Sequence, residues 1–282
     1  MSSHPRIDPE RRRTGVRDGR IRVGALEMAY DSGGDGSALL LIHGFPHDRT
    51  LWIPQLRGLS RQRRVIAPDL RGLGHSEGAP PYTMDRYADD LAAILDALGV
   101  KRAIVGGVSM GGYIALALWR RHRALVAGLV LANTRATADD DAVRERRREM
   151  IALARSRGVA ALADALLSTQ LAPATGERYP ERVAGIRAMF ERAPLAGVVG
   201  ALEALMARPD STPTLPTIEV PTLIIHGSAD AIAPLDAARE MHSRIAGSRL
   251  EVIDGAGHLA NAERPAAFNH LVGEFLAAHR EV

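Results

Sequence analysis

Two five-residue stretches of the chain match the G-x-S-x-G pattern that can surround a nucleophilic serine. They are GHSEG at 74–78 and GVSMG at 107–111. A nucleophilic serine must be exposed, must face a base, and must lie beside backbone N–H groups that can hold the negative oxygen of a tetrahedral intermediate. A sharp turn from a strand into a helix meets all three needs, because the first N–H groups of a helix are unpaired and lie at its positive end.

The flanking residues favour the second match. The apolar residues AIV at 103–105 are typical of a buried strand, and GYIALALWR at 112–120 is typical of a helix. GHSEG instead follows the loop-like stretch APDLRGL and is followed by GAPPY, whose prolines exclude an immediate helix. Ser109 is therefore the predicted nucleophile, and Ser76 is predicted to help hold a loop.

A base and an acid follow two other predicted strands. His258 lies in GAGHLANAERP, after the strand pattern at 250–253, and Asp230 lies in HGSADAIAP, after the pattern at 222–225. The carboxyl ends of parallel strands meet at one edge of a sheet, where functional groups gather. We therefore expect His258 to take the proton of Ser109 and Asp230 to orient the histidine. The chain order Ser, Asp, His is one that such triads use.

Strand and helix patterns alternate along most of the chain. The strand patterns are at 21–23, 25–30, 38–42, 64–67, 103–105, 126–131, 222–225 and 250–253. The helix patterns are at 51–59, 84–98, 113–121, 234–245 and from about 265. This alternation requires crossover connections, so it predicts an α/β fold with a mostly parallel central sheet flanked by helices on both faces.

The alternation stops between residues 136 and 213. Helix patterns without any strand pattern occupy this segment, at 139–156, 159–167, 180–192 and 195–206. We therefore predict an α/β core formed by 21–135 and 214–282, and an all-helical insertion at 136–213 that covers the end of the sheet. An arginine-rich extension occupies 1–20.

The composition excludes several classes of protein. A chain with 46% hydrophobic and 24% charged residues is typical of a globular protein. The chain contains no run of about 18 apolar residues of the kind that spans a membrane. No apolar stretch follows the first arginines, as one would in an export signal. We therefore expect a cytoplasmic protein with no membrane partner. The absence of cysteine excludes disulfides, thiolate metal sites and a cysteine nucleophile.

Arginine dominates the basic residues, because Lys101 is the only lysine in a chain of formal net charge +3. The arginines at 11–20 and 144–148 could contact nucleic acid, but no aromatic residues alternate with them. We therefore expect a solvated tail and a charged helix face, and no nucleic-acid partner. No metal is expected either, because ligand spacing is lacking among His43, His47, His75 and His258.

Beyond its first twenty residues, the chain resembles the α/β-hydrolase superfamily. The motifs that carry the resemblance are HGFP at 43–46, APDLRGLGHS at 67–76, GVSMGG at 107–112, GSADAIAP at 227–234 and GAGHLANAE at 255–263. The resemblance implies that the helical insertion is a cap and that the backbone N–H groups of Phe45 and Met110 form an oxyanion hole. It also implies that no cofactor is needed, and that His43, Asp69 and Arg71 hold loops.

Within the superfamily, a serine at the turn argues against haloalkane dehalogenases and epoxide hydrolases, which use aspartate there. The chain is most similar to bacterial carboxylesterases, to cofactor-free haloperoxidase or perhydrolase-like proteins, and to 3-oxoadipate enol-lactonases. These relatives imply a serine hydrolase that cleaves carboxylic esters through an acyl-enzyme intermediate. The substrate is expected to be a small to medium, largely apolar and uncharged ester or a lactone.

The expected substrate pocket is apolar and uncharged, because most arginines of the insertion are expected on polar helix faces. Besides Met110, its expected lining residues are Trp52, Leu131, Leu166, Leu171, Ile232 and Leu259. Three alternatives stay open: an enol-lactonase or carbon–carbon bond hydrolase acting on aromatic-degradation intermediates, a perhydrolase-like enzyme, and a non-catalytic small-molecule binding protein. The oligomeric state also stays open.

Overall fold

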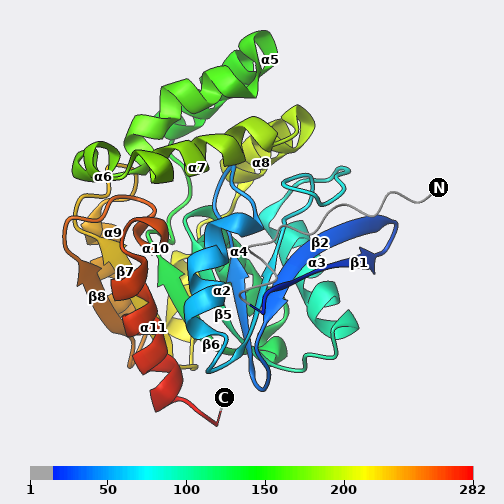
Figure 1. Ribbon diagram of the computed structural model, residues 1–282, viewed down its shortest axis with the longest axis vertical. Coiled ribbons are helices and arrows are strands. Elements are labelled where there is room, and N and C mark those ends of the chain that lie inside the picture. The colour runs from blue at the N-terminus through cyan, green and yellow to red at the C-terminus, as the bar shows by residue number, and fades with distance from the viewer. Residues whose placement is uncertain (1–14, 282) are drawn as a thin grey trace.

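An eight-stranded sheet forms the centre of the structure, a computed structural model that describes residues 15–281 (Figure 1). The strand order is β1-β2-β4-β3-β5-β6-β7-β8. β2 pairs antiparallel with β1 and β4, and the other neighbours pair in parallel, which confirms the mostly parallel sheet. The strands are β1 (Arg17–Val23), β2 (Leu26–Gly33), β3 (Ala38–Ile42), β4 (Arg64–Pro68), β5 (Ala103–Val108), β6 (Val126–Ala132), β7 (Thr222–Gly227) and β8 (Arg249–Ile253).

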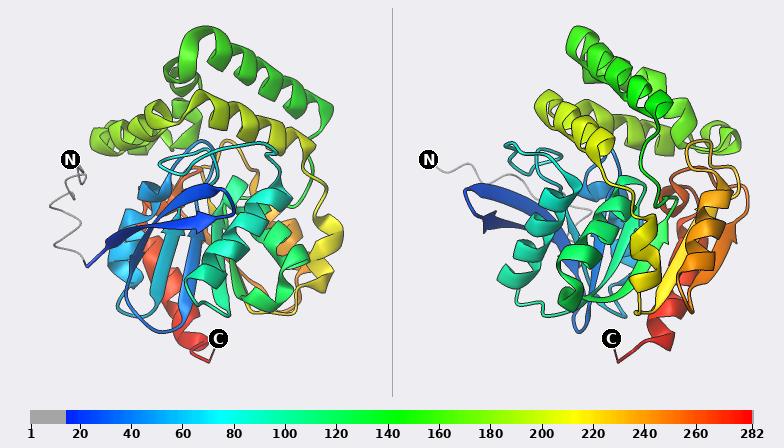
Figure 2. Two further views of the ribbon diagram at one scale, coloured as in Figure 1. Left: turned by 90° about the vertical axis from the view of Figure 1, so that its right-hand side faces the viewer. Right: turned by 180° about the vertical axis from the view of Figure 1, so that it is seen from behind.

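Helices cover both faces of this sheet (Figure 2). One hydrophobic core joins the sheet to α2 and α11, and a second joins it to α3, α4 and α9. Successive side chains of a strand point to opposite faces, so Leu39 of β3 enters the first core and Leu40 the second. The α-helices of the core are α2 (Ile53–Leu59), α3 (Met84–Ala97), α4 (Met110–Arg121), α9 (Leu235–Arg244), α10 (Ala260–Glu263) and α11 (Pro265–Ala278). Shorter 3-10 helices are η1 (Arg49–Trp52), η2 (Arg123–Leu125) and η3 (Thr212–Thr217).

Four helices between β6 and β7 form an insertion over one end of the sheet (Figures 1 and 2). They are α5 (Asp141–Gln170), α6 (Pro173–Arg178), α7 (Pro180–Arg192) and α8 (Leu195–Ala207). Gly158 interrupts α5 with a φ of 82°, a conformation that favours glycine, so the two helices predicted on either side of it adjoin there. The predicted helices are confirmed, and the short helix α6 was not predicted.

The sheet begins earlier than the sequence patterns indicated. β1 starts at Arg17 and pairs with β2 from Arg17 opposite Ser32 to Val23 opposite Leu26. Its first residues are polar and mostly exposed, because β1 lies at the edge of the sheet, and such a strand lacks the apolar run that marked the others. The last residues of the extension predicted at 1–20 therefore belong to the sheet. Residues 1–14 lie outside the described part of the chain.

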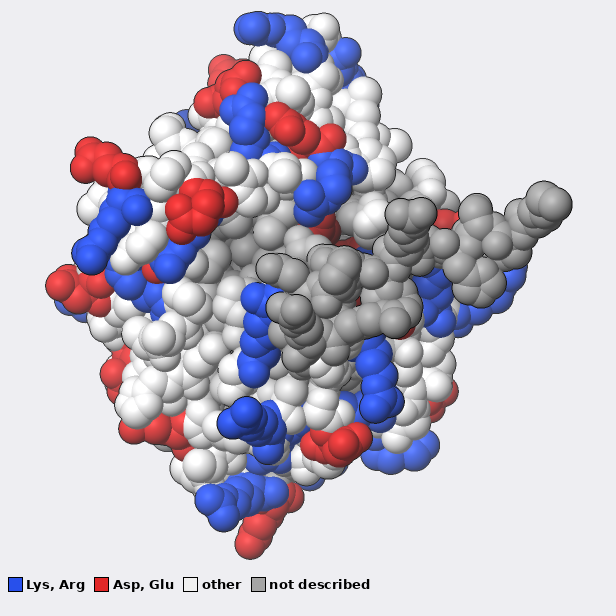
Figure 3. Space-filling view, viewed as in Figure 1, with Lys and Arg blue, Asp and Glu red and all other residues white. Residues whose placement is uncertain are grey.

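Charged side chains of both signs lie side by side over the surface shown in Figure 3. In the arginine run of α5, Arg144 pairs with Asp141 at 3.1 Å and Arg148 pairs with Glu145 at 2.5 Å. These pairs lie on exposed parts of the helix, as expected for a charged helix face. None of the helices within residues 15–281 has the length and apolar character needed to cross a bilayer.

Buried polar groups hold the loop after β4. Asp69 accepts hydrogen bonds from the backbone and the guanidinium of Arg49. The Ser76 hydroxyl accepts from a backbone N–H of β2 at 2.9 Å and donates to the carbonyl of Asp69 at 2.8 Å. Arg71 pairs with Asp90 of α3 at 2.6 Å. Ser76, Asp69 and Arg71 therefore hold this loop, as predicted, and the GHSEG motif belongs to its turn.

Two buried histidines lie in the loop after β3. Nδ1 of His43 donates to the carbonyl of Gly44 at 2.8 Å, and Nε2 accepts from the N–H of Leu70 at 3.0 Å, so the ring is neutral and braces the loop. The ring nitrogens of His47 have no hydrogen-bond partner among the described residues. Burial, together with the charge that the nearby His43 and His258 would carry, lowers the pKa of His47 to about 3.

The buried His47 is expected to make the protein less stable in mild acid. The unfolded chain takes up a proton near pH 6.5, whereas the folded pKa of His47 is about 3. The contribution of this residue to stability is therefore complete above pH 6.5 and is lost as the pH falls toward 3. Between pH 7 and pH 5 the loss from this one group should be about 1–2 kcal/mol.

Urea unfolding at pH 7 and at pH 5 measures this effect. In His47→Phe the drop in the free energy of unfolding should be about 1–2 kcal/mol smaller than in the parent chain. His75→Phe is the matched control, because His75 is exposed and its side chain makes no hydrogen bond or ion pair with the described residues, so the drop should stay unchanged. An equal drop in His47→Phe and the parent would contradict the prediction.

Candidate active site

Ser109 lies on the turn between β5 and α4, at the carboxyl edge of the sheet. Its φ of 54° and ψ of −116° are strained for a residue with a side chain. The N–H of Ser109 donates to the carbonyl of Ala132 at 3.0 Å, and the Thr134 hydroxyl donates to the carbonyl of Ser109 at 2.8 Å. These bonds fix the turn, and its half-buried serine side chain lines a cavity beneath the insertion.

The glycines on either side of Ser109 are required by the close approach of α4 to the sheet. A Cβ on Gly107 would lie 2.2 Å from the carbonyl oxygen of Gly111. A Cβ on Gly111 would lie 2.1 Å from the carbonyl oxygen of Ile42 in β3. Both distances are far shorter than van der Waals contact. The spacing of the glycines in GVSMG is therefore set by the packing of α4 against the sheet. For this reason the strand and helix patterns that flank the motif distinguished it from GHSEG.

His258 and Asp230 form a hydrogen-bonded pair at the same edge of the sheet. Nδ1 of His258 lies 3.0 Å and 2.9 Å from the two carboxylate oxygens of Asp230. Oδ1 of Asp230 also accepts from the N–H groups of Ile232 at 2.8 Å and Ala233 at 3.0 Å. Burial alone would raise the pKa of Asp230, but these partners and the charge of His258 lower it to about 2. The ionised carboxylate keeps a proton on Nδ1 of His258 and leaves Nε2 for other chemistry.

A third side chain, Asn133, holds the same carboxylate and was missed by the sequence analysis. Its Nδ2 donates to Oδ2 of Asp230 at 2.9 Å and to the carbonyl of Gly257 at 3.2 Å. Asn133 directly follows β6 and has a φ of 45°, which asparagine tolerates better than most residues. Its position at the end of a strand was the signal that could have identified it. Asn133 thereby links the end of β6 to the loops that carry Asp230 and His258.

The cavity brings Ser109, His258, Phe45 and Met110 together. No hydrogen bond joins the Ser109 hydroxyl to the His258 ring within residues 15–281, and such bonds often tighten only when substrate binds. Met110 is the first residue of α4, and its N–H and that of Phe45 take part in no hydrogen bond of the described residues. Two free donors therefore border the cavity beside the serine.

The cavity has a volume of about 280 Å³, close to the lower limit of about 300 Å³ for small-molecule sites. Leu166 of α5 and Ile232 line it, as predicted. Its other apolar lining includes Met150 of α5 and Leu205 of α8, which the sequence analysis did not select. The insertion thus supplies much of the lining.

Four of the expected pocket residues do not line this cavity. Trp52 packs in the core beside α2 and α11, with its ring 6.1 Å from that of Phe268, and Leu259 is buried in the same core. Leu131 enters the core on the other face of the sheet. Leu171 lines a separate groove near α6. These residues were expected in the pocket because they lie near a site residue or a strand end in the sequence. That closeness does not fix the direction in which a side chain points.

Arginines also line the cavity, against the expectation of an uncharged pocket. Arg146 and Arg147 of α5 and Arg135 after β6 border the same space as Ser109. The expectation that most arginines of the insertion lie on polar helix faces did not keep them out of the cavity, because Arg147 is only 14% exposed and the exposed Arg146 also borders it. It failed because the apolar pattern of α5 is too weak to show which side of the helix faces the core.

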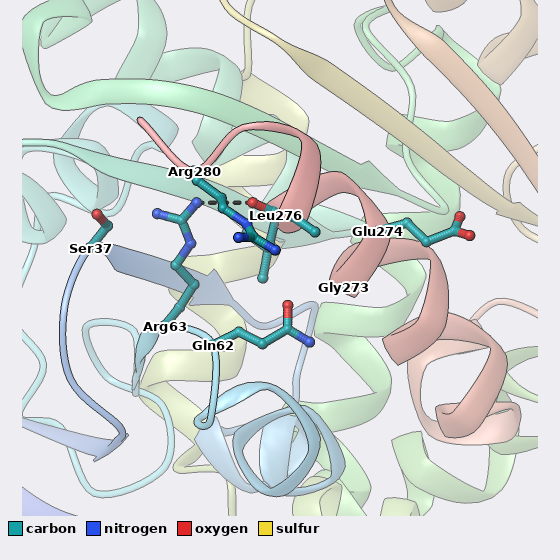
Figure 4. Close-up of a pocket in the computed structure, with 8 residues that line it drawn as sticks. Ser37, Gln62, Arg63, Gly273, Glu274, Leu276 and Arg280 are labelled. Atoms are coloured by element: carbon teal, nitrogen blue, oxygen red, sulfur yellow. Dashed lines mark hydrogen bonds between the residues drawn. The ribbon is translucent and has the colours of Figure 1, made fainter.

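A larger cavity, of about 650 Å³, lies at the opposite end of the strands (Figure 4). Its lining includes Ser37 and Arg63, just before β3 and β4, and the last turns of α11. The Arg63 guanidinium donates to the carbonyls of Leu276 at 3.0 Å and His279 at 2.7 Å, and so stabilises the end of α11. This cavity is far along the sheet from Ser109 and is not the candidate site.

Known proteins share this fold and sequence over nearly the whole chain. The chain is 33% identical over 279 residues to 2-hydroxymuconate semialdehyde hydrolase of Pseudomonas sp. (strain CF600), and the alignment covers 91% of this chain and 92% of that protein. A thermophilic esterase from Thermogutta terrifontis, in a malate-bound structure, matches with a TM-score of 0.89 and 38% identity, covering 93% of this chain and 99% of that one.

The enol-lactonase from Burkholderia xenovorans LB400 matches with a TM-score of 0.86 and 35% identity, covering 92% of this chain and 100% of that one. The family model described as alpha/beta hydrolase fold matches residues 37–265. The resemblance inferred from the motifs is thereby confirmed. The chain belongs to the α/β hydrolase fold family.

Proposed function

We propose that this protein is a serine hydrolase that cleaves carboxylic esters of small to medium substrates through an acyl-enzyme intermediate. The observation that carries the proposal is the His258–Asp230 pair, whose free Nε2 belongs to the same cavity as Ser109 and two unpaired N–H groups. We further propose that the insertion at 136–213 acts as the cap of this site. The similarity to the Thermogutta terrifontis esterase supports ester cleavage.

In the proposed mechanism, Nε2 of His258 takes the proton of Ser109 as the hydroxyl attacks the ester carbonyl. The N–H groups of Phe45 and Met110 hold the oxyanion of the tetrahedral intermediate. The histidine then gives its proton to the leaving alcohol, and water repeats the sequence on the acyl-enzyme. Asp230, with its pKa lowered to about 2, stays ionised and stabilises the imidazolium at each step.

A second candidate is lactone or carbon–carbon bond hydrolysis by the same residues. It is favoured by the similarity to the Burkholderia xenovorans enol-lactonase and to the semialdehyde hydrolase of Pseudomonas. A lactone is a cyclic ester, so the acyl transfer above applies to it without a change of roles. Perhydrolase-like activity would differ only in the second step, in which hydrogen peroxide would attack the acyl-enzyme in place of water.

A non-catalytic binding protein is the less favoured alternative. The strained backbone of Ser109 costs about 1–3 kcal/mol and is a feature that functional sites retain. A pocket that only binds a ligand has no need of that strain, nor of a histidine held by an ionised aspartate. Covalent labelling of the serine distinguishes the two readings.

Ser109→Ala should abolish hydrolysis of p-nitrophenyl acetate, with a loss of about 10³-fold or more, because no nucleophile remains. It should also abolish labelling by a fluorophosphonate probe and leave the melting temperature unchanged or higher. Ser76→Ala is the matched control from the second G-x-S-x-G match. It should keep the labelling while losing about 1 kcal/mol of stability, because two buried hydrogen bonds are removed. Labelling of Ser109→Ala would overturn the assignment.

Asn133→Gly should lower kcat about tenfold and leave KM nearly unchanged, because a hydrogen bond to a charged group is lost behind the reacting atoms. Glycine accepts the positive φ of this position, so the substitution removes the amide without adding backbone strain. Steady-state kinetics with p-nitrophenyl acetate give both constants. A rise in KM at constant kcat would instead place Asn133 in substrate binding.

The small cavity predicts a preference for short acyl groups. Hydrolysis of p-nitrophenyl acetate and butyrate should exceed that of the octanoate in kcat/KM, because about 280 Å³ leaves little room for a longer chain beside the ester. Leu166→Ala removes part of the wall in α5 and should shift the preference toward the octanoate. A parent enzyme that prefers the octanoate would contradict the proposed pocket.

A further inference from the structure

The wall of the cavity formed by the insertion carries positive charge and no acidic side chain. Arg135, Arg146 and Arg147 line the cavity, and its other lining residues include no aspartate or glutamate. Arg208 lies behind them, with its guanidinium 4.1 Å from the ring centre of Tyr113, another lining residue. We call Arg135, Arg146, Arg147 and Arg208 the arginine cluster.

Among the described residues, a single carboxylate, that of Asp139, forms ion pairs with the arginine cluster. Asp139 is fully buried and pairs with Arg135 at 2.9 Å, with Arg147 at 2.5 Å and with Arg208 at 2.6 Å. Burial would raise the pKa of Asp139, but the bonds and charges of Arg147 and Arg208 outweigh it and hold the pKa below its usual value. Asp139 is therefore ionised, and it cannot neutralise three guanidinium groups.

The fourth member of the cluster has no counter-charge. Arg146 is an exposed residue that lines the cavity, and it makes no ion pair or hydrogen bond with any described residue. In the same arginine run of α5, Arg144 and Arg148 each pair with an acidic residue three positions earlier. Within the run at 144–148, the arginine without a partner is therefore one that borders the cavity.

The cluster also has unused hydrogen-bond capacity. The side chain of Arg135 is only 19% exposed, and its buried Nε has no hydrogen-bond partner within the described part of the chain. The side chains of Arg135 and Arg147 are only 19% and 14% exposed and share one carboxylate, so an anion in the cavity would offset part of the cost of burying their charge. The planar guanidinium matches a carboxylate better than it matches any neutral group, because it can donate two parallel hydrogen bonds.

We propose that the substrate carries an ionised carboxylate at a distance from the bond that is cleaved, and that Arg146 and Arg147 bind this carboxylate. This inference rests on the proposed function of the same site and narrows its substrate class to half-esters or lactones of small dicarboxylic acids. The apolar residues Met150 and Leu166 border the same cavity and suit the hydrocarbon part of such a molecule. A carboxylate fits the limited volume of about 280 Å³.

Monomethyl glutarate and dimethyl glutarate form the test pair, because they share a skeleton and an ester and differ in the distal charge. Binding is measured by calorimetry on Ser109→Ala, which keeps the cavity and cannot turn the esters over. The monomethyl ester should bind at least about tenfold more tightly, as expected for a charge-assisted hydrogen bond. Equal binding of the two esters, or binding of neither, would overturn the proposal.

Arg146→Gln, introduced beside Ser109→Ala, should reduce this preference about tenfold. Arg148→Gln is the matched control, because Arg148 lies two positions further along α5, pairs with Glu145 and does not line the cavity. It should leave the preference for the monomethyl ester as it is. A preference that survives Arg146→Gln, or that falls equally in Arg148→Gln, would contradict the role of the cluster.

Hydrolysis of the same two esters by the parent protein separates this proposal from the proposed function. If the monomethyl ester binds selectively and neither ester is hydrolysed, the carboxylate site stands and the hydrolase assignment fails. If both esters are hydrolysed with equal kcat/KM, the assignment stands and the carboxylate site fails. If both proposals hold, the monomethyl ester is hydrolysed with the higher kcat/KM.

Discussion

The close approach of α4 to the carboxyl ends of β3 and β5 is the constraint on which the rest of the structure depends. It leaves no room for a Cβ on Gly107 or Gly111, and it forces Ser109 into a backbone conformation that costs about 1–3 kcal/mol. The strain persists because hydrogen bonds to Ala132 and from Thr134 fix the turn from both sides. In return, the half-buried serine borders the cavity next to the unpaired N–H groups at the start of a helix.

The parallel sheet extends this arrangement to groups that are far apart in the sequence. Each of β5, β6 and β7 ends at the same edge, so Ser109, Asn133 and Asp230 all come to one place from different parts of the chain. Because β6 lies between the other two strands, Asn133 can hold the carboxylate that in turn holds His258. The loop after β4 starts at the same carboxyl edge of the sheet, and the buried polar groups of Asp69, Arg71 and Ser76 hold it in place.

The sequence predicted best those features that depend on short stretches of chain. Each strand and most helices have their own apolar pattern, and Ser109, Asp230 and His258 each follow a strand within a few residues, so their common edge could be inferred. The strand predicted at the position of β1 was too short, because an exposed edge strand has no apolar run that marks its start. Asn133 was overlooked because a lone asparagine after a strand has no spacing partner in the sequence that would mark it.

The lining of the cavity depends on how α5 is rotated over the sheet, and no local pattern records that rotation. At 3.6 residues per turn, Arg146 lies on the side of α5 away from Arg144 and Arg148, whereas Arg147 lies about 100° from Arg146 and about 60° from Arg144. Which of these side chains borders the cavity is decided by contacts outside the helix, among them the pairing of Arg147 with Asp139. Arg146 and Arg147 therefore border the same cavity as Ser109, with their charge only partly compensated by Asp139. Under the proposed carboxylate binding, this cavity would select substrates by sign as well as by size, which an apolar pocket cannot do.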